Sequence, residues 1–417
     1  MLRGKLLQAG VFFAVVGAAL LYWAPWSTSK NDAAACCRRP GVTLSAFAQE
    51  VPAKPLGGDL FPVRSVSDPY PVFNGVAVDP ENNLVVMTDV NRKTLLVYDR
   101  RAAATNPGDL TTPLRQMMGP ETNLGFVAGV ALDPDRREIL AVNNDIEDTM
   151  VGMPIAGNGN QVPSRLLAVP HQAWGVALGR SMGEMCLTVE DKNAVVFYPR
   201  DAKGVLRPKR TIVGPDTELA DPHGVYWDER HNEITVANHG NFKGMYKDEG
   251  AGCTPTGTAD PEEGEFKPPS INVYAGDAEG NRKPMRKIQG DRTQLDFPMG
   301  LSVDEAHDEI IVANNGDSSI LFFKRTAVGN AAPIRVIAGD RTGVNHPMGI
   351  ALDTKNDEIW VSNFGDHTAV AFARTASGNT TPKRVIRTAP VGTPSAGFGN
   401  PQAAAYDSKR QEILVPN

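Results

Sequence analysis

The sequence predicts an all-β protein: a β-propeller of seven four-stranded blades, closed into a ring by N- and C-terminal strands. A short motif recurs seven times, each complete unit between motifs holds four short apolar runs, and the incomplete last unit has its missing strands near the N-terminus. A composition of 40 Gly and 32 Pro in 417 residues is typical of many strands joined by turns. A six-bladed ring is the alternative.

The recurring motif is a small residue followed by alternating apolar positions and usually an Asp. Repetition at a fixed period indicates units that bury their cores against their neighbours. Successive motifs lie 46 to 54 residues apart, apart from one gap of 76, close to the ~40 to 50 residues of a four-stranded blade. One insertion, roughly residues 240–269, accounts for the long gap. The motifs begin at Gly75, Gly129, Gly175, Gly224, Gly300, Gly349 and Ala403.

Each motif is expected to form the first strand of a blade. Nine residues after most motifs a Glu opens a second strand, a third apolar run follows, and a fourth strand opens with Pro-x-Arg. The last motif has only two strands before Asn417, whereas an unpartnered Pro62-x-Arg64 precedes the first motif. We expect these two halves to share one blade, because a closed ring has no exposed sheet edge.

Residues 1–26 predict one transmembrane or signal helix. Arg3 and Lys5 precede an uncharged run, Leu6 to Trp26, which has about the ~20 residues needed to cross a bilayer. This charge order directs the rest of the chain out of the cytoplasm. The run favours an uncleaved anchor, with the propeller in the periplasm or outside the cell. Ala46-Phe47-Ala48 resembles a signal-peptidase site, so secretion after cleavage is the alternative.

After this segment we expect a linker, residues 27–41, and a propeller, residues 42–417. The four cysteines of an exported chain allow three disulfide pairings, between which the sequence does not choose. A net charge of -6 disfavours nucleic acid as a partner. Motifs of serine hydrolases, nucleotide-binding loops and c-type haem attachment are missing from the sequence. The cysteines are Cys36, Cys37, Cys186 and Cys253.

The strand Glu309 to Asn314 and the motif Pro347 to Asp353 resemble those of bacterial NHL-repeat and YVTN lactonase-like β-propellers. The resemblance extends over about Val42 to Asn417. The resemblance implies the fold but not the function, because such propellers include binding scaffolds, lactonases, lyases and dehydrogenases. NHL propellers usually have six blades and the lactonase-like group has seven, so the count of seven motifs favours the second group.

Two positions in each blade are expected to line one mouth of the central channel, where ligands commonly bind. They lie in the loop before the first strand and in the loop after the second. Residues that recur there are expected to be scaffold, and those that break the repeat are informative. The recurrent Asn that ends the second strand is therefore interpreted as a turn cap. It occurs as Asn143, Asn238, Asn314 and Asn363.

Blades three and four are expected to bring Glu190, His223 and His239 to one lip, with His171 nearby. Imidazole and carboxylate groups together can hold a divalent metal such as Ca²⁺ or Zn²⁺, or act as acid and base. The competing interpretation is an ordinary polar rim. Other variable residues at this mouth are candidates for ligand contact or for filling the channel: Asn74, Asp89, Asn144, Trp174, Asn315 and Met348.

The sequence thus favours an extracytoplasmic propeller that binds a protein or small-molecule ligand and is held at a membrane by its N-terminal helix. The repeated scaffold and the lack of catalytic motifs support this hypothesis. The alternative is an enzyme of the lactonase or lyase type that works at the Glu190, His223 and His239 lip with a bound divalent metal. The insertion is a candidate lid or partner contact, and a mobile loop without a role is the alternative.

Overall fold

A computed structural model describes residues 69–103, 106, 108–144, 147–244, 264–395, 405–407, 409 and 412–414. The chain divides into two compact units: Met1–Val63 with Asp248–Thr256, and Arg64–Lys247 with Gly257–Asn417. The first unit lies outside the described residues, and with it the predicted signal helix, the linker and the Pro62 position. No helix in the described part of the chain is long and apolar enough to cross a membrane.

The second unit contains six antiparallel sheets of four strands, each with its strands in chain order. Blade one is β1 (Phe73–Asp79), β2 (Leu84–Asp89), β3 (Thr94–Asp99) and β4 (Arg115–Met117). Blade two is β5 (Val127–Asp133), β6 (Glu138–Asn143), β7 (Thr149–Pro154) and β8 (Arg165–Ala168). Blade three is β9 (Ala173–Gly179), β10 (Glu184–Val189), β11 (Ala194–Pro199) and β12 (Arg210–Ile212).

The remaining blades follow the same plan. Blade four is β13 (Pro222–Asp228), β14 (Glu233–Asn238), β17 (Ser270–Ala275) and β18 (Arg286–Ile288). Blade five is β19 (Pro298–Asp304), β20 (Glu309–Asn314), β21 (Ser319–Lys324) and β22 (Arg335–Ile337). Blade six is β23 (Pro347–Asp353), β24 (Glu358–Asn363), β25 (Thr368–Ala373) and β26 (Arg384–Arg387). Short 3₁₀ turns follow three outer strands: η3 (Pro120–Thr122), η4 (Pro215–Thr217) and η5 (Asp291–Thr293).

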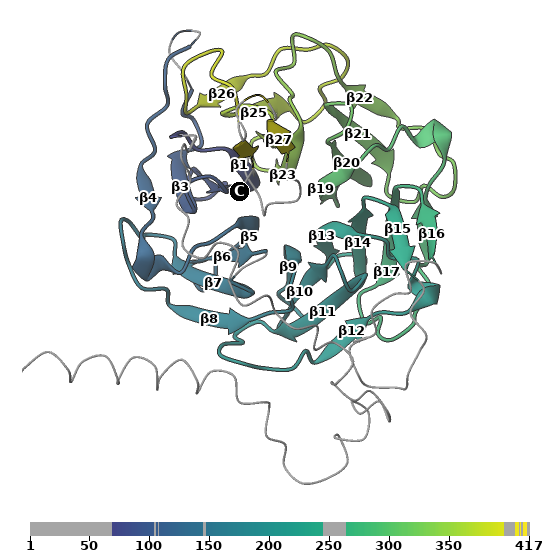
Figure 1. The fold of residues 1–417 in the computed structure, drawn as a ribbon. Coiled ribbons are helices and arrows are strands. Elements are labelled where there is room, and N and C mark those ends of the chain that lie inside the picture. Colours follow the sequence, from purple (N-terminus) through teal and green to yellow (C-terminus); the bar gives the residue numbers. More distant parts are fainter. Residues whose placement is uncertain are drawn as a thin grey trace, which may run out of the picture. The chain divides into compact units, whose positions relative to one another are not determined.

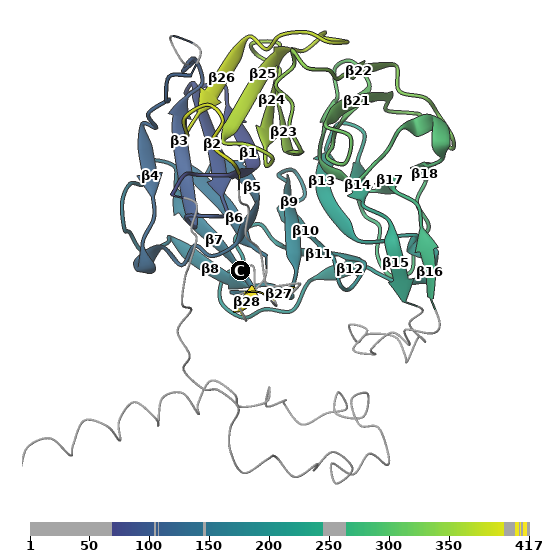
Figure 2. The same cartoon turned by 45° about the horizontal axis from the view of Figure 1, so that its top comes forward.

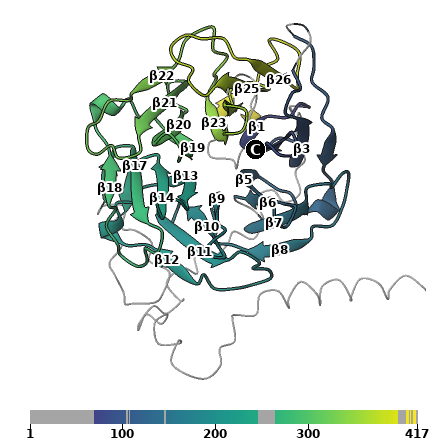
Figure 3. The ribbon, with the colours of Figure 1, turned by 180° about the vertical axis from the view of Figure 1, so that it is seen from behind.

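The first strands of the six blades surround the centre of a ring, and the later strands lie progressively further out (Figure 1). Each first strand contacts the first strands of both neighbouring blades, and β23 of blade six contacts β1 of blade one. The same six strands surround the centre when the ring is seen from behind (Figure 3). A tilted view shows the strands of each blade running side by side (Figure 2). The β-propeller prediction is therefore confirmed.

The predicted number of seven blades is wrong, since the ring closes with six. The seventh motif does form two paired strands, β27 (Ala405–Asp407) and β28 (Glu412–Leu414). Among the described residues, however, these strands pair only with each other. Blade six instead joins blade one directly: Arg100 of blade one forms ion pairs with Asp353 (3.3 Å) and Glu358 (2.7 Å) of blade six.

The motif glycines explain why six motifs make blades. A Cβ built on any of the six glycines would lie closer than 3.0 Å to the carbonyl oxygen of the residue before the next motif. The sixth glycine, Gly349, meets Asn74 of blade one in this way and so completes the ring. Real Cβ atoms do not come so close, and glycine is the residue that permits such an approach of two backbones. The seventh motif begins with Ala403, which carries a Cβ.

The apolar core lies between adjacent blades. Alternate residues of the strands point to opposite faces of a sheet, so each blade supplies side chains to two neighbouring clusters. Between blades six and one, Phe73 and Tyr98 pack with Trp360 and Ile386, all of them fully buried. Burying one such aliphatic or Phe side chain contributes about 1.5–3 kcal/mol. Closure between the first and last blades therefore rests on core packing as well as on ion pairs.

Blade four has additional chain between its second and third strands, where the sequence predicts an insertion. Its two ends form a separate hairpin of β15 (Asn241–Gly244) and β16 (Gly264–Lys267), between the second and third strands of the blade. The residues between these two strands lie outside the described part of the chain. The two long strands on either side, β14 and β17, still pair along their full length. The insertion thus leaves the blade intact.

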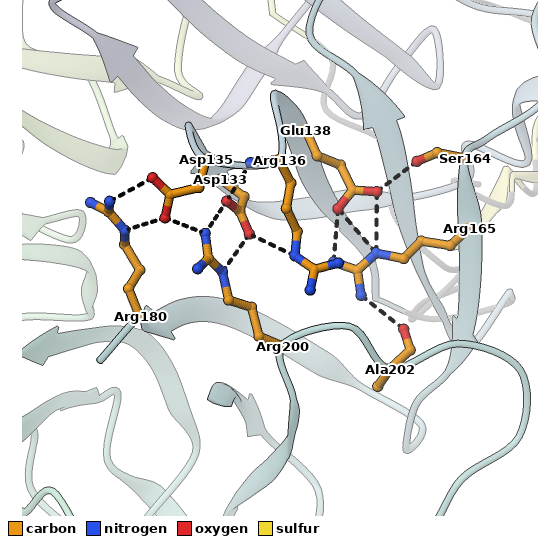
Figure 4. Close-up of polar contacts among 9 residues, drawn as sticks. All are labelled: Asp133, Asp135, Arg136, Glu138, Ser164, Arg165, Arg180, Arg200 and Ala202. Carbon is orange, nitrogen blue, oxygen red and sulfur yellow. Dashed lines mark hydrogen bonds and ion pairs between the residues drawn. The ribbon is translucent and has the colours of Figure 1, made fainter. Parts of the chain in front are cut away.

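The recurrent Glu and the Pro-x-Arg arginine pair with each other in five blades. Arg165 pairs with Glu138 of its own blade at 2.8 Å and donates to the carbonyl oxygen of Ala202 in the next blade (Figure 4). Arg200 of blade three reaches back to Asp133 and Asp135 of blade two. These charges lie where the first strand ends and the second begins. We call this end of the ring the base, and the opposite end the mouth.

Candidate functional site

Four polar residues of blades three and four come together at the mouth. Glu190 follows β10, Asp221 directly precedes β13, His223 is the second residue of β13, and His239 follows β14. The first and second strands of a blade are antiparallel, with Pro222 opposite Asn238, so the loops before β13 and after β14 meet. A bulge interrupts the pairing between Pro222 and Val225. Such bulges re-aim side chains, and His223 lies within this one.

His223 is at the centre of the group and is almost completely buried. Its Nε2 lies 3.3 Å from the Glu190 carboxylate. Its Nδ1 lies 3.1 Å from the backbone oxygen of Asp221 and 3.8 Å from the Asp221 carboxylate. Its ring stacks on the ring of His239 with 3.5 Å between centroids. His223 is therefore surrounded by oxygen atoms at both ring nitrogens.

His239 completes the group from the other side. Its Nδ1 lies 3.4 Å from the Asp221 carboxylate, and its Nε2 contacts the sulfur of Met299. Its backbone N–H donates to the carbonyl oxygen of Asp221, which holds the two loops together. One ligand atom each from Asp221, His223 and His239 lie within 4.8 Å of one another. These side chains form the only such group of three or more metal-ligating residues in the described part of the chain.

Two aromatic side chains flank the histidines. The Trp174 ring lies 4.7 Å from that of His223, and the Phe297 ring lies 5.3 Å from that of His239 in an edge-on arrangement. Asn144 of blade two donates to Glu190 at 3.3 Å and so positions its carboxylate. Asp221 retains 28% of its side-chain exposure and Glu190 retains 15%. The polar group is thus partly open to solvent and lies between apolar walls.

The surroundings set the protonation of this group. Burial, together with the nearby His239, lowers the pKa of His223 to about 3, because a charged imidazole loses its hydration there. Burial alone would raise the pKa of Asp221, but the hydrogen bond from His239 and the nearby His223 hold it below the usual value. At neutral pH, His223 is accordingly neutral and Asp221 is ionised.

The structure brings together the three lip residues that the sequence singled out, Glu190, His223 and His239. It adds Asp221, which sequence reasoning missed. Asp221 has a left-handed backbone conformation (φ 55°), three residues before the motif glycine. A signal was present, because this position varies as strongly between blades as those we considered. Its occupants in blades two to six are Phe126, Gln172, Asp221, Phe297 and His346.

Two of the six candidate ligand-contact residues, Asn144 and Trp174, lie beside this group. The other four lie elsewhere around the mouth. The Asn315 amide donates to the backbone oxygen of Pro347 and contacts the sulfur of the buried Met348. His171 forms an exposed pair with Asp148 at 2.9 Å, outside the group.

Asn74 and Asp89 belong to the scaffold of blade one. Asn74 is buried, and its carbonyl oxygen accepts a hydrogen bond from Ser362 of blade six. Asp89 occupies the position of the recurrent Asn and accepts hydrogen bonds from the backbone N–H groups of Val72, Asn91 and Arg92. Burial raises the pKa of Asp89 to about 7.

The recurrent asparagines are turn caps, as predicted. In each of four blades the Asn side-chain oxygen accepts the backbone N–H of a residue 18 positions earlier, in the loop before the first strand. These contacts shape the mouth loops without leaving the side chains available to a ligand. The capping residues are Asn143, Asn238, Asn314 and Asn363.

Cys186 is a buried free thiol of β10, and burial raises its pKa to about 12, so it is not a nucleophile at neutral pH. The other three cysteines, Cys36, Cys37 and Cys253, lie outside the described residues. A shallow pocket of about 140 Å³ lies at the base between blades one and two, beside Leu84 and Arg115. It occurs where Leu84 replaces the recurrent Glu.

No protein-family model matches the sequence, and no curated protein matches it. Among solved structures, the chain is similar to a nidogen/laminin complex, with a TM-score of 0.48 and 13% identity over 76% of this chain and 93% of that one. It is similar to the WD40 β-propeller domain of Doa1, with a TM-score of 0.46 and 14% identity over 83% and 90%. It is also similar to a functionally unknown protein from Desulfotomaculum acetoxidans, with a TM-score of 0.48 and 15% identity over 83% of this chain and 89% of that one.

Proposed function

We propose that this chain is an extracytoplasmic β-propeller scaffold that binds a ligand at its mouth, over blades three to five. The polar group of Glu190, Asp221, His223 and His239, centred on the buried His223, is the observation that carries the proposal. Burying ionisable groups costs free energy unless they are well paired, and the ring does not need them. The other blades form the same turns with different residues at these positions.

The flanking residues indicate the kind of ligand. Trp174 and Phe297 offer aromatic faces on either side of the two imidazoles, and Glu190 and Asp221 offer acceptors. Small-molecule sites combine apolar walls with a few placed polar groups in this manner. A small polar molecule with an apolar portion, or a side chain of a partner protein, fits this description. The N-terminal apolar run supports an extracytoplasmic location, as does its charge order.

Calorimetric titration with a panel of small carboxylates, amines and lactones tests the proposal. We expect at least one compound to bind, and Glu190→Gln and Trp174→Ala to weaken that binding about tenfold or more. His171→Ala, which removes an exposed His–Asp pair outside the group, should leave the affinity unchanged. Binding that is equally strong in all variants would locate the site elsewhere on the ring.

An enzyme of the lactonase or lyase type is the second candidate. The convergence of Asp221, His223 and His239 within 4.8 Å favours it, because three such ligands can hold a metal that polarises a carbonyl group. Glu190 would then be available as a general base. Hydrolysis of a lactone from the panel, lost in Glu190→Gln, would support this candidate. Binding without turnover would support the scaffold alone.

The resemblance to NHL-repeat propellers also belongs to this proposal. The observed number of six blades is the number usual in that group, and it removes the count that favoured the seven-bladed lactonase-like propellers. Six blades therefore support the NHL-type assignment over the YVTN-type one.

A further inference from the structure

The two ring nitrogens of His223 present a hydrogen-bonding problem that the protein alone does not solve. A neutral imidazole has one N–H and one lone pair. Nε2 faces the Glu190 carboxylate at 3.3 Å, and Nδ1 faces the backbone oxygen of Asp221 at 3.1 Å. When the Glu190 carboxyl is ionised, all of these oxygens are acceptors. If the proton is on Nε2, the Nδ1 lone pair points at oxygen atoms, and if it is on Nδ1, the Nε2 lone pair does.

A cation beside Nδ1 resolves this conflict. The proton then lies on Nε2 and is donated to Glu190, while the Nδ1 lone pair and the Asp221 carboxylate point at the cation. The Nδ1 of His239 faces the same carboxylate at 3.4 Å. Two ligands about 2.1 Å from one metal at a tetrahedral angle are about 3.4 Å apart. The spacing between His239 and Asp221 therefore suits one shared ion. To share it, the two stacked imidazole rings must turn so that both Nδ1 lone pairs point at the ion.

We propose that Asp221, His223 and His239 bind one divalent transition-metal ion such as Zn²⁺, with Glu190 orienting His223 from outside the ligand set. This inference deepens the proposed function, on which it rests for the location of the site. A carboxylate that accepts the second N–H of a metal-bound histidine fixes the ring and strengthens the ligand. Asn144 in turn donates to Glu190 and holds that carboxylate in place.

The donor set selects the class of metal. Two imidazoles and one carboxylate suit Zn²⁺ or Co²⁺, whereas Ca²⁺ needs six to eight oxygen ligands. The sequence left Ca²⁺ and Zn²⁺ open, and the geometry favours Zn²⁺. Three protein ligands leave a coordination position vacant in a tetrahedral site. With Trp174 and Phe297 beside the two imidazoles, that position is suited to an oxygen atom of the ligand.

The repeat provides an internal control for this assignment. Blade five has the same loop geometry, with Phe297 in a left-handed conformation and the N–H of Asn315 donating to its carbonyl oxygen. At the positions of Asp221, His223 and His239 it has Phe297, Met299 and Asn315. The turn therefore forms without metal ligands, and turn formation does not account for the three ligands of blade four.

Metal titration of the full-length chain tests the proposal. Protein stripped with a chelator and dialysed should bind one equivalent of Zn²⁺ by calorimetry, and Co²⁺ should give visible d–d absorption without a thiolate band. His239→Ala and Asp221→Asn should each weaken Zn²⁺ binding about 100-fold or more, and Glu190→Gln about 10- to 100-fold. The matched variant His171→Ala should bind as wild type does. Circular dichroism verifies the folding of each variant.

Two results would overturn the inference. One is folded wild-type protein that takes up no stoichiometric Zn²⁺ or Co²⁺. The other is uptake that persists in a folded His223→Gln, His239→Ala double variant, or that shows thiolate absorption from cysteine ligands. If compounds of the ligand panel bind while the metals do not, the metal site fails and the binding function stands. If the metals bind and no compound does, the metal site stands and the ligand-binding function fails.

Discussion

The base and the mouth of the ring differ in how charged residues are distributed among the blades. At the base, Glu, Asp and Arg recur from blade to blade and pair with one another, as Arg165 does with Glu138 and Arg200 with Asp133. At the mouth, the recurrent residue is a neutral asparagine in four blades and Asp89 in blade one. Blades three and four add a group of ionisable residues that breaks the repeat. Glu190 and His223 belong to that group.

In a repeat protein, contacts that recur from blade to blade separate scaffold residues from functional ones. A polar residue that every blade uses in the same contact is explained by the ring. A buried polar residue that one blade uses alone, such as His223, needs another explanation. We therefore expect the recurrent ion pairs at the base to stabilise the ring and the residues that break the repeat at the mouth to bind a ligand.

Glu358→Ala at the base should lower stability most. The Glu358 side chain is almost fully buried and pairs with Arg100 of blade one and with Arg384 and Lys383 of its own blade. Its removal leaves the buried Arg100 with one carboxylate fewer, and breaking a buried pair costs about 3–5 kcal/mol. Urea unfolding measures the change. Lys355→Ala, which removes an exposed pair with Glu81, should cost less than about 1 kcal/mol.

If Glu358→Ala and Lys355→Ala destabilise the protein equally, the ion pairs at the base do not contribute to closing the ring. A strong effect at Glu358 together with unchanged ligand or metal binding would separate the two ends of the ring, as the comparison requires.

Gly129→Ala should have the next largest effect. The added Cβ would lie closer than 3.0 Å to the backbone oxygen of Trp174 in blade three. Backbone atoms cannot turn away as a flexible side chain can, and overpacking of this kind costs about 1–3 kcal/mol. The control is Gly204→Ala, which meets nothing within 4 Å but has φ of +72° and should cost about 1 kcal/mol for its backbone conformation alone. Thermal and urea unfolding compare the two variants.

Gly129→Ala should also affect the mouth, because Trp174 lies there beside His223. A variant that remains folded should show altered Trp174 fluorescence as the two blades move apart. Equal stability of wild type and Gly129→Ala would mean that the blades do not pack on the motif glycines.

Asp89→Asn should change how stability depends on pH. The pKa of Asp89 in the folded protein is about 7, well above the ordinary pKa of an Asp carboxyl, because the group is buried. Folding therefore favours its protonated form, so its contribution is fully present below about pH 4 and is lost as the pH rises to about 7. Asn cannot ionise and already occupies this position in four other blades. We expect the variant to exceed wild type by about 2 kcal/mol at pH 8.

The reciprocal variant, Asn143→Asp in blade two, is the matched control for Asp89→Asn. It places a carboxylate in a buried cap and removes two donated hydrogen bonds, to Asn123 and Thr149. Its stability should fall as the pH rises from 4 to 8. Urea unfolding at pH 4 and pH 8 measures how the free energy of unfolding changes with pH. If this change is the same in Asp89→Asn as in wild type, the capping interpretation is wrong.

The repeat made most of the fold predictable. Glycine spacing, the Glu and the Pro-x-Arg arginine each mark one strand of a blade, and the structure places them in one pairing scheme. The number of blades was wrong because it rested on the apolar pattern of the seventh motif. That pattern reports pairing, and the two strands after Ala403 do pair. A strand joins the ring only where a glycine without a Cβ lets two backbones approach each other. The seventh motif has Ala403 at this position, and its Cβ prevents that approach.

The site was predictable in part for a related reason. Glu190, His223 and His239 occupy positions that the strand count identifies, so their convergence followed from the blade geometry. Asp221 was missed because it lies two residues upstream of the position that we considered in the loop before the first strand. Its role depends on a left-handed conformation (φ 55°) that an apolar repeat does not encode. The imidazole contacts also depend on a strand bulge that the sequence pattern does not show.

The smallest expected effect is a gain at the base of blade one. Leu84 stands where five other blades have Glu, and Arg115 lies nearby, donating to the backbone oxygen of Ile155 while its buried Nε has no hydrogen-bond partner in the described structure. Leu84→Glu should supply the missing carboxylate, and Leu84→Gln removes the same apolar contacts without adding charge.

Comparing the two variants isolates the ion pair, which we expect to stabilise the Glu variant by about 0.5–1 kcal/mol in urea unfolding. High salt should reduce the difference, because screening weakens a partly exposed pair. If the Glu variant is no more stable than the Gln variant, blade one does not need a Glu–Arg pair of its own at the base. The ion pairs of Arg100 with blade six would then be enough to join blade one to the ring.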